Sequence, residues 1–141
     1  MFCREWLAQL EHSKDQIAAA GLSVVGVAIS EPKHAQRYCP QLAPSLVCLC
    51  GLGIETHKAY GLQQGNAAQL VGPQVVIAGT RAAAKGILAK GIVAGEVTGN
   101  WKMLAGTFIV NPAGLIQYSF YSDFAGDHPP LTEILNNHAS K

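Results

Sequence analysis

Hydrophobic positions recur at two different spacings along the chain, and the change in spacing separates expected helices from expected strands. Near the start, apolar side chains fall on one face at helical spacing, which predicts a helix over residues 2–20 that Gly21 ends. A short apolar and β-branched run follows at residues 23–30. Because this run is apolar throughout rather than alternating, we expect a strand covered on both faces, as in a parallel sheet flanked by helices.

Helix and strand continue to alternate after this run. Glu31 and Pro32 are expected to begin a second helix, with Ser30 as its N-cap, and Pro40 is expected to end or kink it. Residues 45–50 form the next short apolar run. This run predicts a second short strand.

The pattern is weaker in the middle of the chain. Residues 55–60 predict a short helix that Gly61 ends. Between residues 63 and 100 glycine and alanine are dense, and only residues 81–90 favour a helix.

The last third of the chain predicts a β-hairpin and a terminal helix. Residues 106–110 and 115–120 are strand-like, and the residues 111–114 between them are Asn, Pro, Ala and Gly, which suit a turn. A helix is expected from residue 131 to about 137. The whole order indicates one α/β domain over residues 1–141, in which an antiparallel hairpin lies at one edge of a mixed sheet.

Composition and charge exclude several classes of protein. Only 13% of the residues are charged, the net charge is +1, and the Lys and Arg residues are scattered, which argues against a nucleic-acid binder. The chain has no run of eighteen or more apolar residues, so we expect no membrane span. We also recognise no signal peptide and expect a cytoplasmic protein.

Five blocks of sequence, taken in order, carry a resemblance to a known family. They read FCREWL, VVGV, KAYGL, GTFIVNPAG and GDHPPL. In this order and spacing the chain resembles the peroxiredoxin-like branch of the AhpC/TSA family in the thioredoxin-fold superfamily. The resemblance implies a thioredoxin-like fold with a mixed sheet flanked by helices. It also implies a thiol-dependent activity that reduces a peroxide or a disulfide with electrons from a thiol donor.

The resemblance gives Cys3 a specific place. In the family, a strand and a Cys-Pro-Phe-Cys-Arg motif come before the first helix, and Phe2, Cys3 and Arg4 match the second half of that motif. We therefore expect the chain to be truncated, without the N-terminal strand and the attacking cysteine. Cys3 then matches the resolving cysteine of the motif. Near a free N-terminus it is the candidate catalytic thiol, which Arg4 would support electrostatically if its side chain turned toward the sulfur.

The start of the expected hairpin is the second candidate part of the site. Gly106 stands where thioredoxins carry a cis-proline that faces the active thiol, and Thr107 follows it. A glycine there allows a substrate to approach the backbone closely. The resemblance thus implies that Gly106 and Thr107 border the path of the substrate.

Three further cysteines are candidate secondary thiols. In a chain without an export signal, cysteines are expected to be thiols rather than a disulfide framework. Cys39 is expected in the core, with a resolving partner as the alternative. Cys48 and Cys50 stand two apart on a strand and so face the same side, which suits two buried apolar residues or, alternatively, a thiol pair or a soft-metal site. Since no CxxC pair is present, we expect no metal and no cofactor.

The function predicted from the sequence has two competing forms. If the chain is an enzyme, it is a thiol peroxidase or a thiol-disulfide oxidoreductase. The alternatives are a non-catalytic thioredoxin-like binding module and a fragment that lacks the attacking cysteine. An exposed sheet edge would also be compatible with a homodimer.

Overall fold

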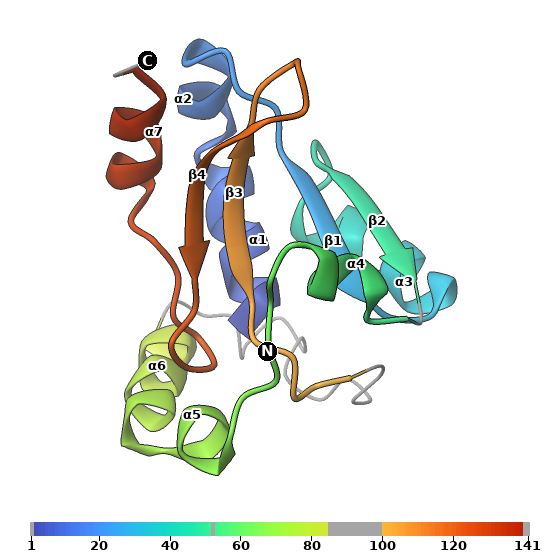
Figure 1. The fold of residues 1–141 in the computed structure, drawn as a ribbon, viewed down its shortest axis with the longest axis vertical. Helices are drawn as coiled ribbons and strands as arrows, with labels where there is room; N and C mark the ends of the chain where they lie inside the picture. The colour runs from blue at the N-terminus through green and yellow to red at the C-terminus, as the bar shows by residue number, and fades with distance from the viewer. Residues whose placement is uncertain (1, 52, 85–99, 140–141) are drawn as a thin grey trace.

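The computed structural model describes residues 2–51, 53–84 and 100–139 of the chain (Figure 1). Helices and strands alternate in the first half, and a hairpin and a helix close the second half. In chain order the elements are α1 (Phe2–His12), α2 (Lys14–Ala19), β1 (Val25–Ile29), α3 (Pro32–Leu42), β2 (Val47–Gly51), α4 (Glu55–Ala59), α5 (Ala67–Val71), α6 (Pro73–Ala84), β3 (Gly106–Val110), β4 (Ile116–Tyr121) and α7 (Leu131–Ala139).

The strands form two pairs among the described residues. β1 and β2 are parallel, and their register places Gly26 opposite Cys48 and Ala28 opposite Cys50. β3 and β4 are antiparallel, with an irregularity between Ile109 and Val110. The expected parallel pair and the expected hairpin are both confirmed.

The first helix is shorter than its apolar pattern predicts. Ser13 divides the expected helix into α1 and α2, and its amide is shared between the carbonyls of Gln9 and Leu10, at 3.1 Å from each. Gly21 has φ +76° and follows the last helical turn, as predicted. The interruption leaves the apolar spacing intact, which is why the pattern does not reveal it.

α3 differs from its prediction at both ends. Glu31, not Ser30, is the N-cap, and the helix continues through Pro40 to Leu42. Leu42 is buried and packs against Leu7 and Tyr38. This packing with α1 stabilises the last turn, although proline lacks an amide hydrogen.

The middle of the chain also departs from the pattern. The structure has α5, which the sequence reading missed, although Asn66 and Gln69 form a capping box at its start. The helix expected at residues 81–90 overlaps only the end of α6; residues 85–90 lie outside the described part. The turn between β3 and β4 is as predicted, because the Leu115 amide donates to Asn111 Oδ1 at 2.9 Å and Gly114 has φ +82°.

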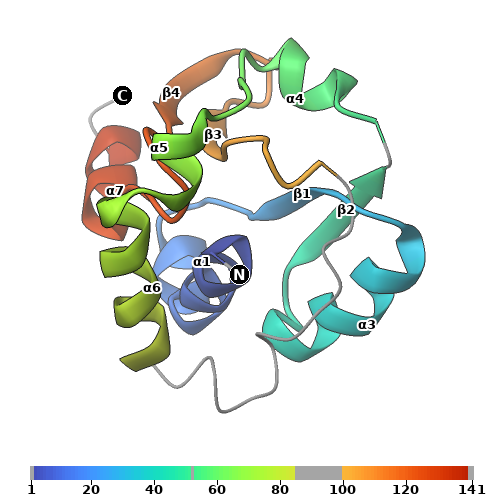
Figure 2. The ribbon, with the colours of Figure 1, turned by 90° about the horizontal axis from the view of Figure 1, so that it is seen from below.

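One face of the β1–β2 sheet is covered and the other is open. Leu7 on α1 packs over Gly26, and α3 packs on β2, so α1 and α3 lie on one face (Figure 2). The opposite face carries four apolar side chains that are about half exposed: Val25, Val27, Val47 and Leu49. The expected cover on both faces is therefore not found among the described residues. None of the described helices has the length and apolar character to cross a bilayer.

Candidate functional site

Cys3 lies in the first turn of α1 and is an exposed, free cysteine. The next residue, Arg4, places its guanidinium carbon 4.0 Å from the ring centroid of Tyr38 on α3. Arg37 approaches the same ring at 5.4 Å. The first turn of α1 is thus attached to α3 at Tyr38, the residue just before Cys39. Two positively charged guanidinium groups lie against the ring of Tyr38.

The α1 face that carries Cys3 is turned toward Cys48. Cys3 and Leu7 are four residues apart on a helix and therefore share a face. A Cβ added to Gly26 would lie 3.1 Å from Leu7 Cδ1 and 3.8 Å from Cys48 Sγ. Leu7 and the sulfur of Cys48 thus meet over the same point of β1.

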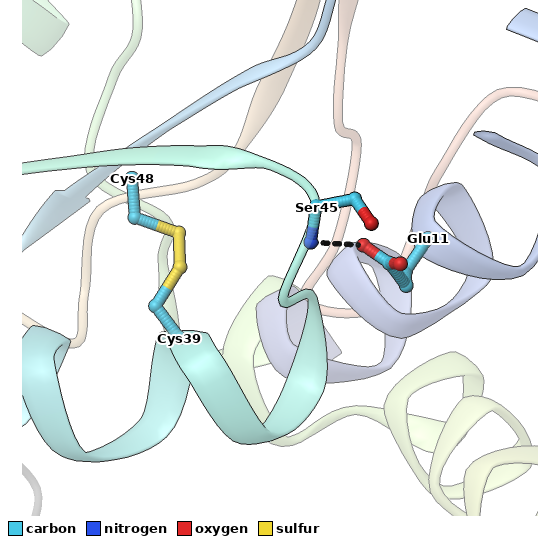
Figure 3. The surroundings of a disulfide bond; sticks show 4 residues. All are labelled: Glu11, Cys39, Ser45 and Cys48. Carbon is cyan, nitrogen blue, oxygen red and sulfur yellow. Dashed lines mark hydrogen bonds between the residues drawn. A yellow bond between two sulfur atoms is a disulfide. The ribbon is translucent and has the colours of Figure 1, made fainter.

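Cys39 and Cys48 form a disulfide that joins α3 to β2 (Figure 3). Their Cα atoms are 6.5 Å apart, and the two residues are nine positions apart in sequence. This corrects the expectation of a free core thiol at Cys39 and of two unbonded cysteines at Cys48 and Cys50. Cys50 is a half-buried free thiol, so the alternative of a Cys48–Cys50 pair or metal site is also wrong as stated.

A detectable signal for the disulfide was present in the sequence. The α3–β2 turn includes Ala43 and Ser45, and Cys39 and Cys48 stand at similar distances before and after it. A helix that folds back on the following strand brings such positions together. The spacing matches no common cysteine motif, so only the expected helix–turn–strand unit could have indicated the bond.

The turn between α3 and β2 is held against α1 (Figure 3). The Ser45 amide donates to Glu11 Oε2 at 3.0 Å, and Lys14 Nζ donates to Ser45 Oγ at 3.0 Å and to Glu11 Oε1 at 3.1 Å. Burial by itself would raise the pKa of Glu11. The hydrogen bonds from Ser45 and the contact with Lys14 outweigh it and hold the pKa below the usual carboxyl range. The disulfide therefore lies beside an independently anchored turn.

Gly106 and Thr107 begin β3. A Cβ added to Gly106 would lie 2.6 Å from Leu62 Cδ2 and 2.9 Å from Phe108 Cε2, so a larger residue there would require these side chains to shift. The side chains that come close to Gly106 are thus Leu62 and Phe108. Its role on the path of a substrate, with Thr107, stays a prediction.

An open groove of about 260 Å³ lies between α1, α6 and the segment before α7. Trp6 and His128 stack along it, with ring centroids 5.2 Å apart and planes at 7°. Arg81 also lines the groove and donates to the Gly126 carbonyl at 2.9 Å. Its Nε lies 3.8 Å from the fully buried carboxylate of Glu5, a polar core residue that sequence reasoning did not single out.

The described part of the chain contains no cluster of side chains suited to holding a metal ion. Within residues 2–51, 53–84 and 100–139, His, Cys, Asp and Glu side chains do not gather in groups of three or more. The chemistry that the described residues bring together is that of sulfur: one exposed thiol, one half-buried thiol and one disulfide.

Comparison with known proteins agrees with this sulfur chemistry. The sequence matches the family described as AhpC/TSA antioxidant enzyme over residues 9–123, a range that contains Cys39, Cys48 and Cys50 but not Cys3. No curated protein and no solved structure matches the chain. Because the family match covers most of the sequence and the model has the mixed α/β architecture of a thioredoxin-like protein, this chain belongs to the AhpC/TSA antioxidant enzyme family, whose members share thiol-dependent redox function.

Proposed function

We propose that this protein is a thiol peroxidase in which Cys3 attacks the peroxide. The observation that carries the proposal is the position of Cys3: an exposed free thiol in the first turn of α1. Arg4, the next residue, attaches this turn to Tyr38 on α3, and an exposed thiol is accessible to a small peroxide. Gly106 and Thr107, at the start of β3, are proposed to border the path of the substrate, as the family resemblance implies.

The chemistry follows the usual order of cysteine oxidation. The Cys3 thiolate attacks one oxygen of the peroxide, the O–O bond breaks, and the other oxygen leaves as water or an alcohol. Cys3 becomes a sulfenic acid. A thiol then condenses with it, releasing water and forming a disulfide, which a thiol electron donor reduces. The peroxide substrate, the thiol donor and a cytoplasmic location are parts of this proposal.

The test is peroxide consumption by the purified chain with a dithiol reductant. We expect turnover by the wild-type chain and its loss in Cys3→Ser. Cys50→Ser is the matched control, because Cys50 is the other free cysteine in the described part of the chain, and its removal should leave turnover unchanged. Equal turnover in wild type and Cys3→Ser would reject Cys3 as the attacking thiol, and no turnover in the wild type would reject the peroxidase.

A second candidate function is a non-catalytic module that binds another copy of the chain. The open face of the β1–β2 sheet favours it, because Val25, Val27, Val47 and Leu49 form a contiguous apolar surface. This candidate predicts that the chain self-associates and that Val27→Lys abolishes the association in sedimentation velocity. A chain that is monomeric at all concentrations would exclude it.

A further inference from the structure

We infer that Cys39 and Cys48 are the resolving pair of this protein: they take the oxidising equivalent from Cys3, and their disulfide is the bond that the thiol donor reduces. The inference rests on the proposed function for the origin of that oxidising equivalent. It assigns a redox role to two residues that are neither in the first turn of α1 nor adjacent to each other in sequence.

Two independent contacts hold α1 against the elements that carry the pair. Arg4 follows Cys3 directly, and its guanidinium stacks on Tyr38, which directly precedes Cys39. On the other side, Leu7 and the sulfur of Cys48 converge over Gly26. The first contact joins α1 to α3, and the second joins α1 to β2. Both elements that hold the disulfide therefore pack against α1.

Cys3 lies about one helical turn from Leu7 along α1. Cys3 and Leu7 lie on the same face of α1, and four residues of an α-helix advance about 6 Å along its axis. The first turn of a helix opens at the lowest free-energy cost of any part of it, because its amides lack partners within the helix. In the proposed cycle this turn unwinds, and Cys3 moves from its exposed position to the sulfur of Cys48.

The electrostatic surroundings favour sulfur exchange. Arg4 and Arg37 both approach Tyr38, at 4.0 and 5.4 Å from its ring centroid, so two guanidinium groups flank the residue that precedes Cys39. Positive charge stabilises the thiolate that must attack or leave during exchange. Cys39 and Cys48 are also only half-buried, which leaves the bond open to a small thiol donor.

The disulfide closes a turn that is already fixed by other interactions. The Ala43 amide donates to the Cys39 carbonyl at 2.8 Å, the Leu46 amide donates to the Ala43 carbonyl at 3.1 Å, and Ser45 is bonded to Glu11. Reduction of the disulfide would therefore leave the turn formed. A pair that can open without loss of the surrounding structure is suited to repeated oxidation and reduction.

Electrons pass from the donor through Cys39 and Cys48 to the Cys3 sulfenic acid in three steps. The Cys48 thiol condenses with the Cys3 sulfenic acid, which releases water and forms a Cys3–Cys48 disulfide. The Cys39 thiolate attacks Cys48, which forms the Cys39–Cys48 disulfide and frees the Cys3 thiolate. A donor dithiol then reduces the Cys39–Cys48 disulfide and is itself oxidised to a disulfide. The net reaction converts one peroxide and one dithiol into one alcohol or water, one water and one disulfide.

The test follows disulfide formation in a single turnover. The chain is fully reduced, freed of reductant and mixed with one equivalent of hydrogen peroxide; thiols are then blocked at intervals and disulfides are mapped by mass spectrometry. In the wild type we expect the Cys39–Cys48 bond to form as peroxide disappears. In Cys39→Ser we expect a trapped Cys3–Cys48 bond, and Cys50→Ser should behave as the wild type. Circular dichroism of the reduced wild type checks that the chain stays folded without the bond.

The possible failures are distinguishable. If peroxide disappears at the wild-type rate while Cys39 and Cys48 remain thiols, the inference is overturned and the proposed peroxidase stands. A Cys3–Cys50 bond in the wild type would also overturn it, because Cys50 would then be the resolving thiol. If the wild type consumes no peroxide, the proposed function fails and the inference falls with it.

Discussion

The fully buried carboxylate of Glu5 on α1 lies 3.8 Å from the guanidinium Nε of Arg81 on α6. Gln9 also donates to this carboxylate, at 3.0 Å. A charge inside a protein is tolerated only when it is compensated, so removing Arg81 should be costly. We expect Arg81→Met to lower the free energy of unfolding by about 3 kcal/mol, the low end for breaking a buried pair, because the Arg81 side chain is 52% exposed. Urea unfolding measures this.

The control places the same change in a Glu5→Gln background. There the buried charge is absent, and Arg81→Met should cost only about 1 kcal/mol for the lost hydrogen bond to the Gly126 carbonyl. The difference between the two costs is the coupling of the pair. Equal costs in both backgrounds would show that Arg81 does not compensate Glu5.

The elements that the sequence predicted well are those set by short local patterns. The parallel strands β1 and β2 follow from two apolar runs separated by a helix, and the β3–β4 hairpin follows from Asn111 and Gly114 in their turn positions. In each case the residues that determine the element are its own or its immediate neighbours. The family resemblance, which rests partly on the residues of β1 and of the hairpin, is confirmed by the family match.

The features that the sequence did not predict depend on packing between distant segments. Pro40 stays inside α3 because Leu42 and Tyr38 pack against Leu7, a contact between residues more than thirty positions apart. The burial of Glu5 depends on α6 in the same way. The bond between Cys39 and Cys48 needs α3 to fold back on β2, which no cysteine spacing records. Local sequence propensity does not predict any of these three features.

Gly61 is expected to be intolerant of a side chain for two reasons. Its φ is +79°, and a Cβ there would lie 3.2 Å from the hydroxyl oxygen of Tyr121, which donates a hydrogen bond to the Tyr60 carbonyl. The left-handed conformation alone costs alanine about 1–2 kcal/mol. We expect Gly61→Ala to lower the free energy of unfolding by this amount and by a further contribution from the contact with Tyr121.

Gly114→Ala separates the two contributions. Gly114 has φ +82° but an added Cβ would meet nothing within 4 Å, so only the conformational cost applies. Thermal unfolding of both variants should show a larger loss for Gly61→Ala. A loss of the same size in the two variants would mean that Tyr121 moves aside without cost.

His57 on α4 should give the protein a pH-dependent stability. Burial lowers its pKa below the ordinary value of 6.5, and its Nδ1 meets no hydrogen-bond partner in the described part of the chain. The unfolded chain therefore binds a proton at higher pH than the folded chain does. It follows that the free energy of unfolding is highest above pH 6.5 and declines as the pH falls toward the lowered pKa.

Urea unfolding between pH 5 and 8 tests this dependence. We expect His57→Leu to flatten the decline of stability below about pH 6.5, the ordinary value for histidine. His12→Gln is the control, because His12 is exposed and at the end of α1, and its substitution should retain the slope. An unchanged slope in His57→Leu would assign the pH dependence to other groups.

The Cys39–Cys48 disulfide should stabilise the chain modestly, because it closes a short loop. The two cysteines are nine positions apart, and the loop-entropy relation gives a contribution of about 2–3 kcal/mol for such a loop. Reductant should lower the free energy of unfolding of the wild type by this amount. The same reductant should not affect a Cys39→Ser, Cys48→Ser double variant, and Cys50→Ser should respond to it as the wild type does.

A loss of all structure on reduction would contradict the prediction, because the hydrogen bonds from Ser45 to Glu11 and from Ala43 to Cys39 hold the turn without the bond. Modest stabilisation and retained structure are together what a bond that opens in each catalytic cycle requires.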